Sequence, residues 1–189
     1  MNDRSLQSLG PWKRRASAYR YENPWIRVRH DEVVTPSGSE GVYGVVQFKN
    51  LAIGVIPLAD DGTTWLVGQY RYPHGAYSWE IPEGGGPVGT DPQVSARREL
   101  AEEVGLEAAR LDLVLEMDLS NSVTDERSLI YVARGLTPCP QSPDDTEELA
   151  LRRVHFDELY RDVVEGHHRD SLTVAGVLKL KIMLDAGLV

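Results

Sequence analysis

The sequence predicts an α+β fold in which helices cover a mixed β-sheet. Three observations support this class. Segments with the pattern of β-strands fill most of residues 25–70 and return between 111 and 156. A glycine-rich turn leads into a capped helical segment at 91–105, and two more helical patterns follow the last strand. This order of elements, with strands before and after a loop and helix and further helices at the end, is typical of a sheet covered by helices.

The first 48 residues show strand patterns only in their second half. Residues 1–20 show no clear period, and the first ten are expected to be frayed. From Trp25 onward the chain predicts three short strands, at 25–30, 33–34 and 42–48. A sheet of this size is marginal alone, so we expect it to pack on another surface.

Residues 49–189 hold the other strand patterns and the helical patterns. Two β-rich runs, at 51–58 and 64–70, flank the turn sequence Asp60-Asp61-Gly62, which predicts a β-hairpin. The later patterns predict strands at 111–118, 129–133 and 149–156, and helices at 157–165 and 171–186. The last helix is apolar nearly all round, so we expect it to be buried. His167 and His168, between the two helices, are expected at the surface.

The segment 91–105 carries the start and stop signals of a helix. Asp91 can cap the amides of the first turn, and Pro92 suits the first helical position. Gly105 can take the left-handed conformation that ends a helix. At about 100° per residue the apolar residues share one side, which is suited to packing. The opposite side gathers three glutamates, Glu99, Glu102 and Glu103.

Crowded glutamates on one helix face need a compensating charge. Like charges three or four residues apart destabilise a helix by roughly 0.2–0.5 kcal/mol per pair. Arg98 can offset one of them through its four-residue spacing to Glu102. A divalent cation over the face would make the arrangement favourable, and oxygen-only ligands suit Mg²⁺, with Mn²⁺ also acceptable. A solvated acidic face is the alternative for the glutamates considered alone.

The spacing of these residues resembles the Nudix box of the Nudix hydrolases. Eight defined positions match, namely Gly84, Arg98-Glu99-Leu100, Glu102-Glu103 and Gly105-Leu106. The first glutamate of the family pattern falls on Thr90, which bears on the rigidity of the loop more than on catalysis. The resemblance implies an α/β/α sandwich over 49–189. It also implies metal binding by Glu99, Glu102, Glu103 and the backbone carbonyl of Glu83.

Two short sequence motifs before the box resemble those of the ADP-ribose pyrophosphatase branch of this family, which hydrolyses nucleoside diphosphate sugars. Gln69-Tyr70-Arg71 matches its Gln-x-Arg strand end, and Glu80-Ile81-Pro82 matches its approach to the box. The resemblance implies that Arg71 contacts substrate phosphate and that Glu80 belongs to the substrate site. It further implies that residues 1–48 form a small N-terminal β subdomain. The same resemblance implies a homodimer that holds the substrate base between N-terminal residues, with Trp25 as the candidate.

A polar segment after the box carries further candidates. The sequence Thr124-Asp125-Glu126-Arg127-Ser128 matches a Ser/Thr-x-Glu-Arg-Ser segment of the same branch. The resemblance implies that Glu126 lies at the metal and substrate site and that Arg127 is near the substrate. A solvated loop acid is the alternative for Glu126.

An acidic run before the last strand could supply the general base. The branch places an acid-x-acid pair there as base or as a further metal ligand, and Asp145 and Glu147 match it by spacing. Glu148 is a close competitor. The alternative is a solvated acidic loop.

Composition narrows the partners and the compartment. The formal net charge of −9 argues against a broad nucleic-acid surface, so we expect a small-molecule substrate. The single cysteine, Cys139, excludes an internal disulfide. No apolar run approaches the length of a membrane span, and no signal-peptide pattern is present. We therefore expect a cytoplasmic protein.

The expected reaction is metal-dependent hydrolysis of the pyrophosphate bond of a nucleoside diphosphate sugar, with ADP-ribose first. The products would be a nucleoside monophosphate and a sugar phosphate. Other nucleotide sugars such as GDP-mannose are alternatives within this class. A Nudix-fold sensor of nucleotide sugars without turnover is the alternative from another class. Only Thr90 favours a sensor, whereas the three retained glutamates argue against it.

Overall fold

The computed structural model describes residues 6–142 and 148–189. The chain divides into two compact units. The first unit comprises Met1–Asn50 with Asp118–Glu126, and the second comprises Leu51–Met117 with Arg127–Val189. The division into domains at 1–48 and 49–189 stays a prediction. None of the helices among the described residues is long and apolar enough to span a membrane.

The first unit is built on one four-stranded antiparallel sheet in the order β1-β2-β3-β4. Its strands are β1 (Gln7–Leu9), β2 (Trp12–Glu22), β3 (Ile26–Val34) and β4 (Glu40–Phe48). The expectation that the first ten residues are frayed is wrong for Gln7–Leu9, which form β1, and the long strand β2 was not predicted. Most residues of β2 are exposed, so no apolar alternation marks this strand in the sequence.

The segment 118–126 also belongs to the first unit. The backbone N–H of Val46 donates to the carbonyl of Val123 at 2.9 Å, and Val46 forms a parallel bridge with Thr124. The Asp125 carboxylate accepts the N–H of Phe48 at 2.9 Å. These bonds attach the polar segment to the last strand of the sheet, although about 75 residues separate them in sequence.

The second unit contains two sheets, in the orders β8-β5-β10-β9 and β11-β6-β7. Strands β5 and β10 pair in parallel, whereas β6 is antiparallel to both of its neighbours. The bounds are β5 Asn50–Pro57, β6 Thr63–Arg71, β7 Ala76–Glu80, β8 Glu83–Pro87, β9 Leu106–Asp118, β10 Arg127–Pro138 and β11 Ala150–His155. The helices are α1 Pro92–Glu99, α2 Phe156–Val164 and α3 Ser171–Asp185.

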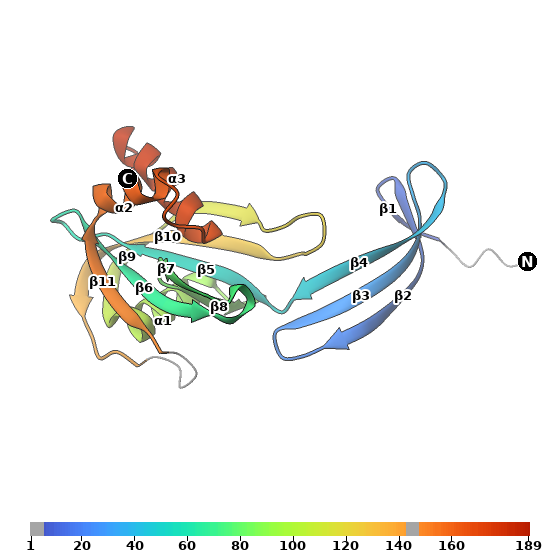
Figure 1. The fold of residues 1–189 in the computed structure, drawn as a ribbon, viewed down its shortest axis with the longest axis horizontal. Coiled ribbons are helices and arrows are strands. Elements are labelled where there is room, and N and C mark those ends of the chain that lie inside the picture. Colours follow the sequence, from blue (N-terminus) through green and yellow to red (C-terminus); the bar gives the residue numbers. More distant parts are fainter. Residues whose placement is uncertain (1–5, 143–147) are drawn as a thin grey trace, which may run out of the picture. The chain divides into compact units, whose positions relative to one another are not determined.

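Helices cover both faces of the central strands β5 and β10 (Figure 1). On one face, Ile53 and Val55 of β5 lie in the core cluster with Ala96 and Leu100 of the α1 segment. On the other face, Gly54 lies against Leu172 of α3, because a Cβ at this glycine would come within 3.3 Å of its side chain. Successive strand residues point to opposite faces. The predicted α/β/α sandwich is confirmed.

Helix α3 is buried along one stripe only. Leu172, Gly176 and Leu180 are buried against the sheet side, whereas Ile182 is 63% exposed. The expectation of a helix buried all round is wrong. The apolar composition of α3 does not reveal which face packs, since its hydrophobic residues do not segregate to one side.

Candidate active site

The glutamates of the box lie on a helix that changes from α-helical to π-helical geometry. Asp91 caps α1 by accepting the N–H of Gln93 at 3.0 Å, with Pro92 in the first position, as the sequence predicts. After Glu99 the helix continues as a π-helical turn, Leu100–Val104, and ends at Gly105 with φ 71°. We call residues 92–104 the box helix. Such turns occur often at functional sites, because they re-aim side chains and free backbone carbonyls.

Two of the three box glutamates are buried. Glu99 is 7% and Glu103 is 2% exposed, whereas the Glu102 side chain is 37% exposed. Arg98 pairs with Glu99 at 2.5 Å and with Glu102 at 2.6 Å, so a single guanidinium offsets two of the crowded charges. The same guanidinium donates to the carbonyl of Gly85 at 2.9 Å. The predicted pair between Arg98 and Glu102 is present. Through its bond to Gly85, Arg98 also connects the helix to strand β8.

Strand β8 brings its backbone against the buried glutamates. The N–H of Glu83 donates to Oε2 of Glu103 at 2.9 Å. At Gly84 an added Cβ would overlap the Glu99 carboxylate, so only glycine lets the strand approach this closely. The Glu103 carboxylate therefore adjoins the peptide between Pro82 and Glu83, and the Glu99 carboxylate lies beside Gly84. The residues of the Nudix box thus bring Glu99, Glu103 and the backbone of strand β8 together at one place.

Thr90 has a local role in place of the family glutamate. Its hydroxyl donates to the carbonyl of Pro87 at 2.7 Å, and its N–H points to the same oxygen at 3.2 Å. The residue is exposed. Thr90 thus closes the turn before α1, and the turn is held without a carboxylate at this position.

A second group of acids surrounds Arg71 at the end of β6. Arg71 pairs with Glu80 at 2.5 Å through Nη2 and donates from Nε to both oxygens of the same carboxylate. Nη2 also lies 2.5 Å from Oε1 of Glu83. Burial raises the pKa of the Glu83 carboxyl well above its ordinary value, and the nearby Asp170 carboxylate adds to the rise. The other oxygen of Glu83, Oε2, is buried and has no hydrogen-bond partner among the described residues.

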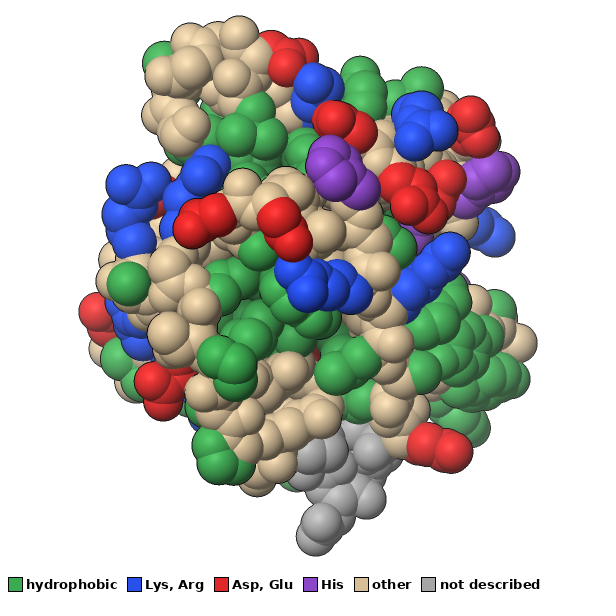
Figure 2. Space-filling view, turned by 90° about the vertical axis from the view of Figure 1, so that its left-hand side faces the viewer, with side chains coloured by type: hydrophobic (Ala, Val, Ile, Leu, Met, Phe, Trp, Pro, Cys, Tyr) green, Lys and Arg blue, Asp and Glu red, His purple; other side chains and the backbone are tan. Residues whose placement is uncertain are grey.

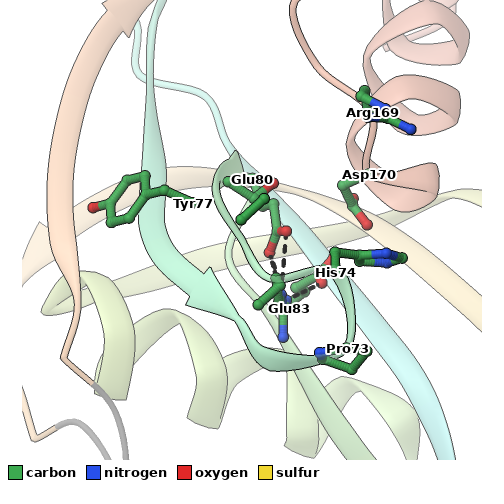
Figure 3. Close-up of a pocket in the computed structure, with 10 residues that line it drawn as sticks. Pro73, His74, Tyr77, Glu80, Glu83, Arg169 and Asp170 are labelled. Carbon is green, nitrogen blue, oxygen red and sulfur yellow. Dashed lines mark hydrogen bonds and ion pairs between the residues drawn. The ribbon is translucent and has the colours of Figure 1, made fainter.

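These residues open onto a cavity of about 470 Å³. It lies between the β6–β7 turn and the start of α3, and Figure 3 shows the Asp170 carboxylate directed from α3 toward the turn that carries His74. Carboxylate oxygens of Glu80, Glu83 and Asp170 lie within 4.8 Å of one another. The sequence analysis did not identify Asp170, Arg169 or His74. Asp170 could have been noticed as an acid directly before a predicted helix, where it caps α3.

The start of α3 is fastened to the strand that carries Glu80. The Thr173 hydroxyl, which is fully buried, accepts the N–H of Ile81 at 2.9 Å. The ring of His168 is hydrogen-bonded through Nδ1 to the carbonyl of Trp79 at 2.8 Å. The expectation that His168 is a surface residue is therefore wrong, whereas its neighbour His167 is exposed.

Four further predicted site residues are among the described residues. Trp25, which is 66% exposed, and Glu126 belong to the first unit. Burial raises the pKa of the Glu126 carboxyl, and the charge of Asp125 adds to this effect. Arg127 is exposed in the second unit and pairs with Glu116 of β9. Glu148 is exposed.

Two further candidates, Asp145 and Glu147, lie outside the described residues. The segment just before them is attached to the end of the box helix. The Gln141 side chain donates to the carbonyl of Glu103 at 2.6 Å, and the N–H of Ser142 donates to that of Glu102 at 3.3 Å. The site roles of all these residues stay predictions.

Comparison with known proteins gives two family matches. The NUDIX domain family matches residues 48–173, and the nucleoside diphosphate sugar hydrolase N-terminal domain matches residues 12–46. An ADP-ribose pyrophosphatase from Mycobacterium tuberculosis is 32% identical over 80% of this chain and 74% of its own length. A methanol dehydrogenase activator from Bacillus methanolicus is 31% identical over 83% of this chain and 85% of its own.

A solved structure shares the fold of the whole chain. It is described as an ADP compounds hydrolase, and it matches with a TM-score of 0.83 over 97% of this chain and 100% of its own. At 21% identity this likeness shows the fold alone. The resemblance drawn from the box residues is confirmed by the family match, which covers the box helix, strand β8 and Arg71. The chain therefore belongs to the NUDIX family.

Proposed function

We propose that this chain hydrolyses the pyrophosphate bond of a nucleoside diphosphate sugar, with ADP-ribose as the first candidate substrate. The products are a nucleoside monophosphate and a sugar phosphate. The observation that carries the proposal is the burial of Glu99 and Glu103 against the backbone of Glu83 and Gly84. The match of residues 12–46 to a nucleoside diphosphate sugar hydrolase domain and the relative named ADP-ribose pyrophosphatase support the substrate class. GDP-mannose is an alternative within that class.

The residues of the box fit a divalent cation, for which we propose Mg²⁺, with Mn²⁺ also acceptable. Two deeply buried carboxylates beside a strand backbone form the oxygen-rich site that hard cations prefer. Glu99, Glu103 and the Glu83 carbonyl would hold the ion, and Glu102 would complete its shell. Bound there, a divalent ion neutralises diphosphate charge and lowers the pKa of the attacking water.

The remaining residues orient the substrate and remove a proton from the attacking water. Arg71 donates to a phosphate oxygen while Glu80 holds the guanidinium in a fixed plane, because the pair is bonded through both Nε and Nη2. A carboxylate removes the proton of the attacking water, and the candidates are Asp145, Glu147, Glu148 and Glu126. Trp25 and Arg127 stay candidates for contacts with the substrate.

The proposal extends to partners and compartment. We place the protein in the cytoplasm as a homodimer, as the resemblance implies. Figure 2 shows Lys and Arg side chains interspersed with Asp and Glu on the face it displays, rather than gathered in one basic patch. With a net charge of −9, this distribution supports a small-molecule substrate over nucleic acid.

A substrate panel tests the proposal. ADP-ribose, GDP-mannose and UDP-glucose are incubated with the native chain and Mg²⁺, and nucleoside monophosphate is separated by chromatography. We expect release of AMP and ribose 5-phosphate from ADP-ribose, and loss of this activity when EDTA replaces Mg²⁺. Only background hydrolysis across the panel would contradict the proposal and favour a sensor. A higher rate with GDP-mannose would reassign the substrate within the class.

A further inference from the structure

The cavity beside Arg71 shares a wall with the box, so one ligand can reach both. Glu83 forms that wall, since its N–H is bonded to Glu103 while its side chain lines the cavity. The cavity volume of about 470 Å³ lies within the range of roughly 300–1,000 Å³ that is usual for small-molecule sites. A diphosphate at the box would therefore have one of its two substituents near this cavity.

The lining of the cavity favours a group that is rich in hydroxyls. Three carboxyl groups line it, those of Glu80, Glu83 and Asp170, together with two guanidiniums, those of Arg71 and Arg169. The lining thus offers both acceptors and donors of hydrogen bonds. Carboxylates accept hydrogen bonds from hydroxyls and guanidiniums donate to them, so the set suits the vicinal hydroxyls of a sugar ring.

The two arginines of the cavity differ in how far they are already paired. Arg71 is held by Glu80 and Glu83, both at 2.5 Å. Arg169 is exposed at the cavity, and its side chain makes no ion pair or hydrogen bond with any residue that the structure describes. The guanidinium of Arg169 is thus the donor that a ligand can recruit without breaking an existing pair.

The backbone at Arg169 is fixed on both sides. His168, immediately before it, is buried and bonded to the carbonyl of Trp79. Asp170, immediately after it, accepts the N–H of Thr173 at 2.7 Å, and Thr173 in turn accepts the N–H of Ile81. Both neighbours are therefore anchored to the segment that carries Glu80. A side chain on such a support reaches a ligand with little cost in backbone order.

We propose that this cavity holds the sugar ring of the substrate, with Arg169 and Asp170 as the residues that determine specificity for the sugar. This inference rests on the proposed function and names the half of the substrate that lies there. Arg169 donates to ring hydroxyls, and the Asp170 carboxylate accepts from them. Figure 3 shows the two residues side by side at the start of α3.

Product inhibition separates the two halves of the substrate. Ribose 5-phosphate and AMP are each tested as inhibitors of ADP-ribose hydrolysis by the native chain, Arg169→Gln and Asp170→Ser. Serine caps helices about as well as aspartate, so Asp170→Ser keeps the start of α3 while withdrawing the carboxylate from the cavity. The matched controls are Arg161→Gln on α2 and Asp185→Ser at the far end of α3, both exposed and outside the cavity lining.

We expect each cavity variant to raise the inhibition constant of ribose 5-phosphate by about 10- to 100-fold, the loss typical of a hydrogen bond to a charged group. The inhibition constant of AMP should change by less than about twofold, and KM for ADP-ribose should rise more than kcat falls. The controls should leave all these values unchanged. Unaltered inhibition by ribose 5-phosphate, or equal weakening of both inhibitors, would overturn the inference.

A failure of the proposed function is distinguishable from a failure of this inference. If the native chain hydrolyses no nucleotide sugar, the proposed function fails, and calorimetric titration with ribose 5-phosphate tests the cavity directly. Binding by the native chain that is weakened in Arg169→Gln and Asp170→Ser would support a sugar site without turnover. Equal binding by all the variants, or no binding by the native chain, would overturn the sugar site.

Discussion

The backbone N–H of Glu83 donates to Oε2 of Glu103 at 2.9 Å, and this bond joins the box helix to the strand that borders the cavity. The side chain of Glu83 turns the other way and pairs with Arg71. One residue thus contacts the expected metal site through its backbone and, through its side chain, the arginine that we propose to bind phosphate. Substitutions in the box helix should therefore lower the rate of turnover, whereas substitutions in the cavity should weaken substrate binding.

Replacing Glu103 should abolish turnover without unfolding the protein. In Glu103→Gln the amide oxygen can still accept the N–H of Glu83, but the charge that a divalent ion requires is gone. We expect kcat for ADP-ribose to fall by at least about 100-fold, with little change in the melting temperature. The control is Glu107→Gln, an exposed glutamate of β9. A Glu103→Gln protein that retains the native rate would remove this carboxylate from the catalytic site.

Adding one methyl group at Gly84 should displace the carboxylate of Glu99. A Cβ there overlaps that carboxylate, so strand or helix must move. Overpacking of this kind costs about 1–3 kcal/mol, and we expect Gly84→Ala to lower both the free energy of unfolding and the Mg²⁺-dependent rate. Urea denaturation and AMP release measure the two effects. Gly44→Ala is the control, because a Cβ at Gly44 meets nothing within 4 Å. Equal effects of the two substitutions would contradict the role assigned to Gly84.

Several features with local signals were predictable from the sequence. The β-hairpin predicted around Asp60-Asp61-Gly62 is wrong, however, because β5 and β6 pair in different sheets. The box helix begins at the Asp91 cap and ends at Gly105, and both signals lie within a few residues of the structure they determine. The π-helical turn inside it leaves no such signal. Strand β2 was missed because its residues are exposed, so no apolar period marks it. An apolar period in a sequence reflects buried side chains, so a strand that buries few side chains leaves no such period.

Features that depend on distant partners were not predictable. Thr173 bonds to Ile81 across 92 positions, and His168 bonds to Trp79 across 89. These two bonds bring Asp170 to the acids of the cavity, yet nothing near residue 170 in the sequence indicates such a contact. Of the three acids around Arg71, Glu80 was predicted as a residue of the substrate site and Glu83 only through its backbone carbonyl, whereas Asp170 was not predicted. The box itself was found because its residues share one short helix and the strand before it.

Restoring the family glutamate at Thr90 should change little. Thr90 is exposed and its hydroxyl bonds only locally, to the carbonyl of Pro87. Exposed substitutions usually alter stability by less than about 0.5 kcal/mol, and we expect Thr90→Glu to keep kcat within about twofold of the native value. Thermal denaturation and AMP release test this. A gain of tenfold or more in activity would show that the missing carboxylate limits catalysis in this chain.

The stability contributed by Glu83 should fall as the pH rises. Burial, reinforced by Asp170, raises the pKa of this carboxyl well above the ordinary 4.5. Between 4.5 and the raised pKa the folded protein holds a proton that the unfolded chain has lost, so ionisation at Glu83 opposes folding there. Below this window both states are protonated and the cost disappears. Glu83→Gln removes the titration, and its stability relative to the native chain should increase as the pH rises above 4.5. Urea denaturation below this pH and at neutral pH, with Glu107→Gln as control, measures the difference. Parallel pH dependence of the native and Glu83→Gln proteins would show that Glu83 ionises as freely in the folded state as in the unfolded chain.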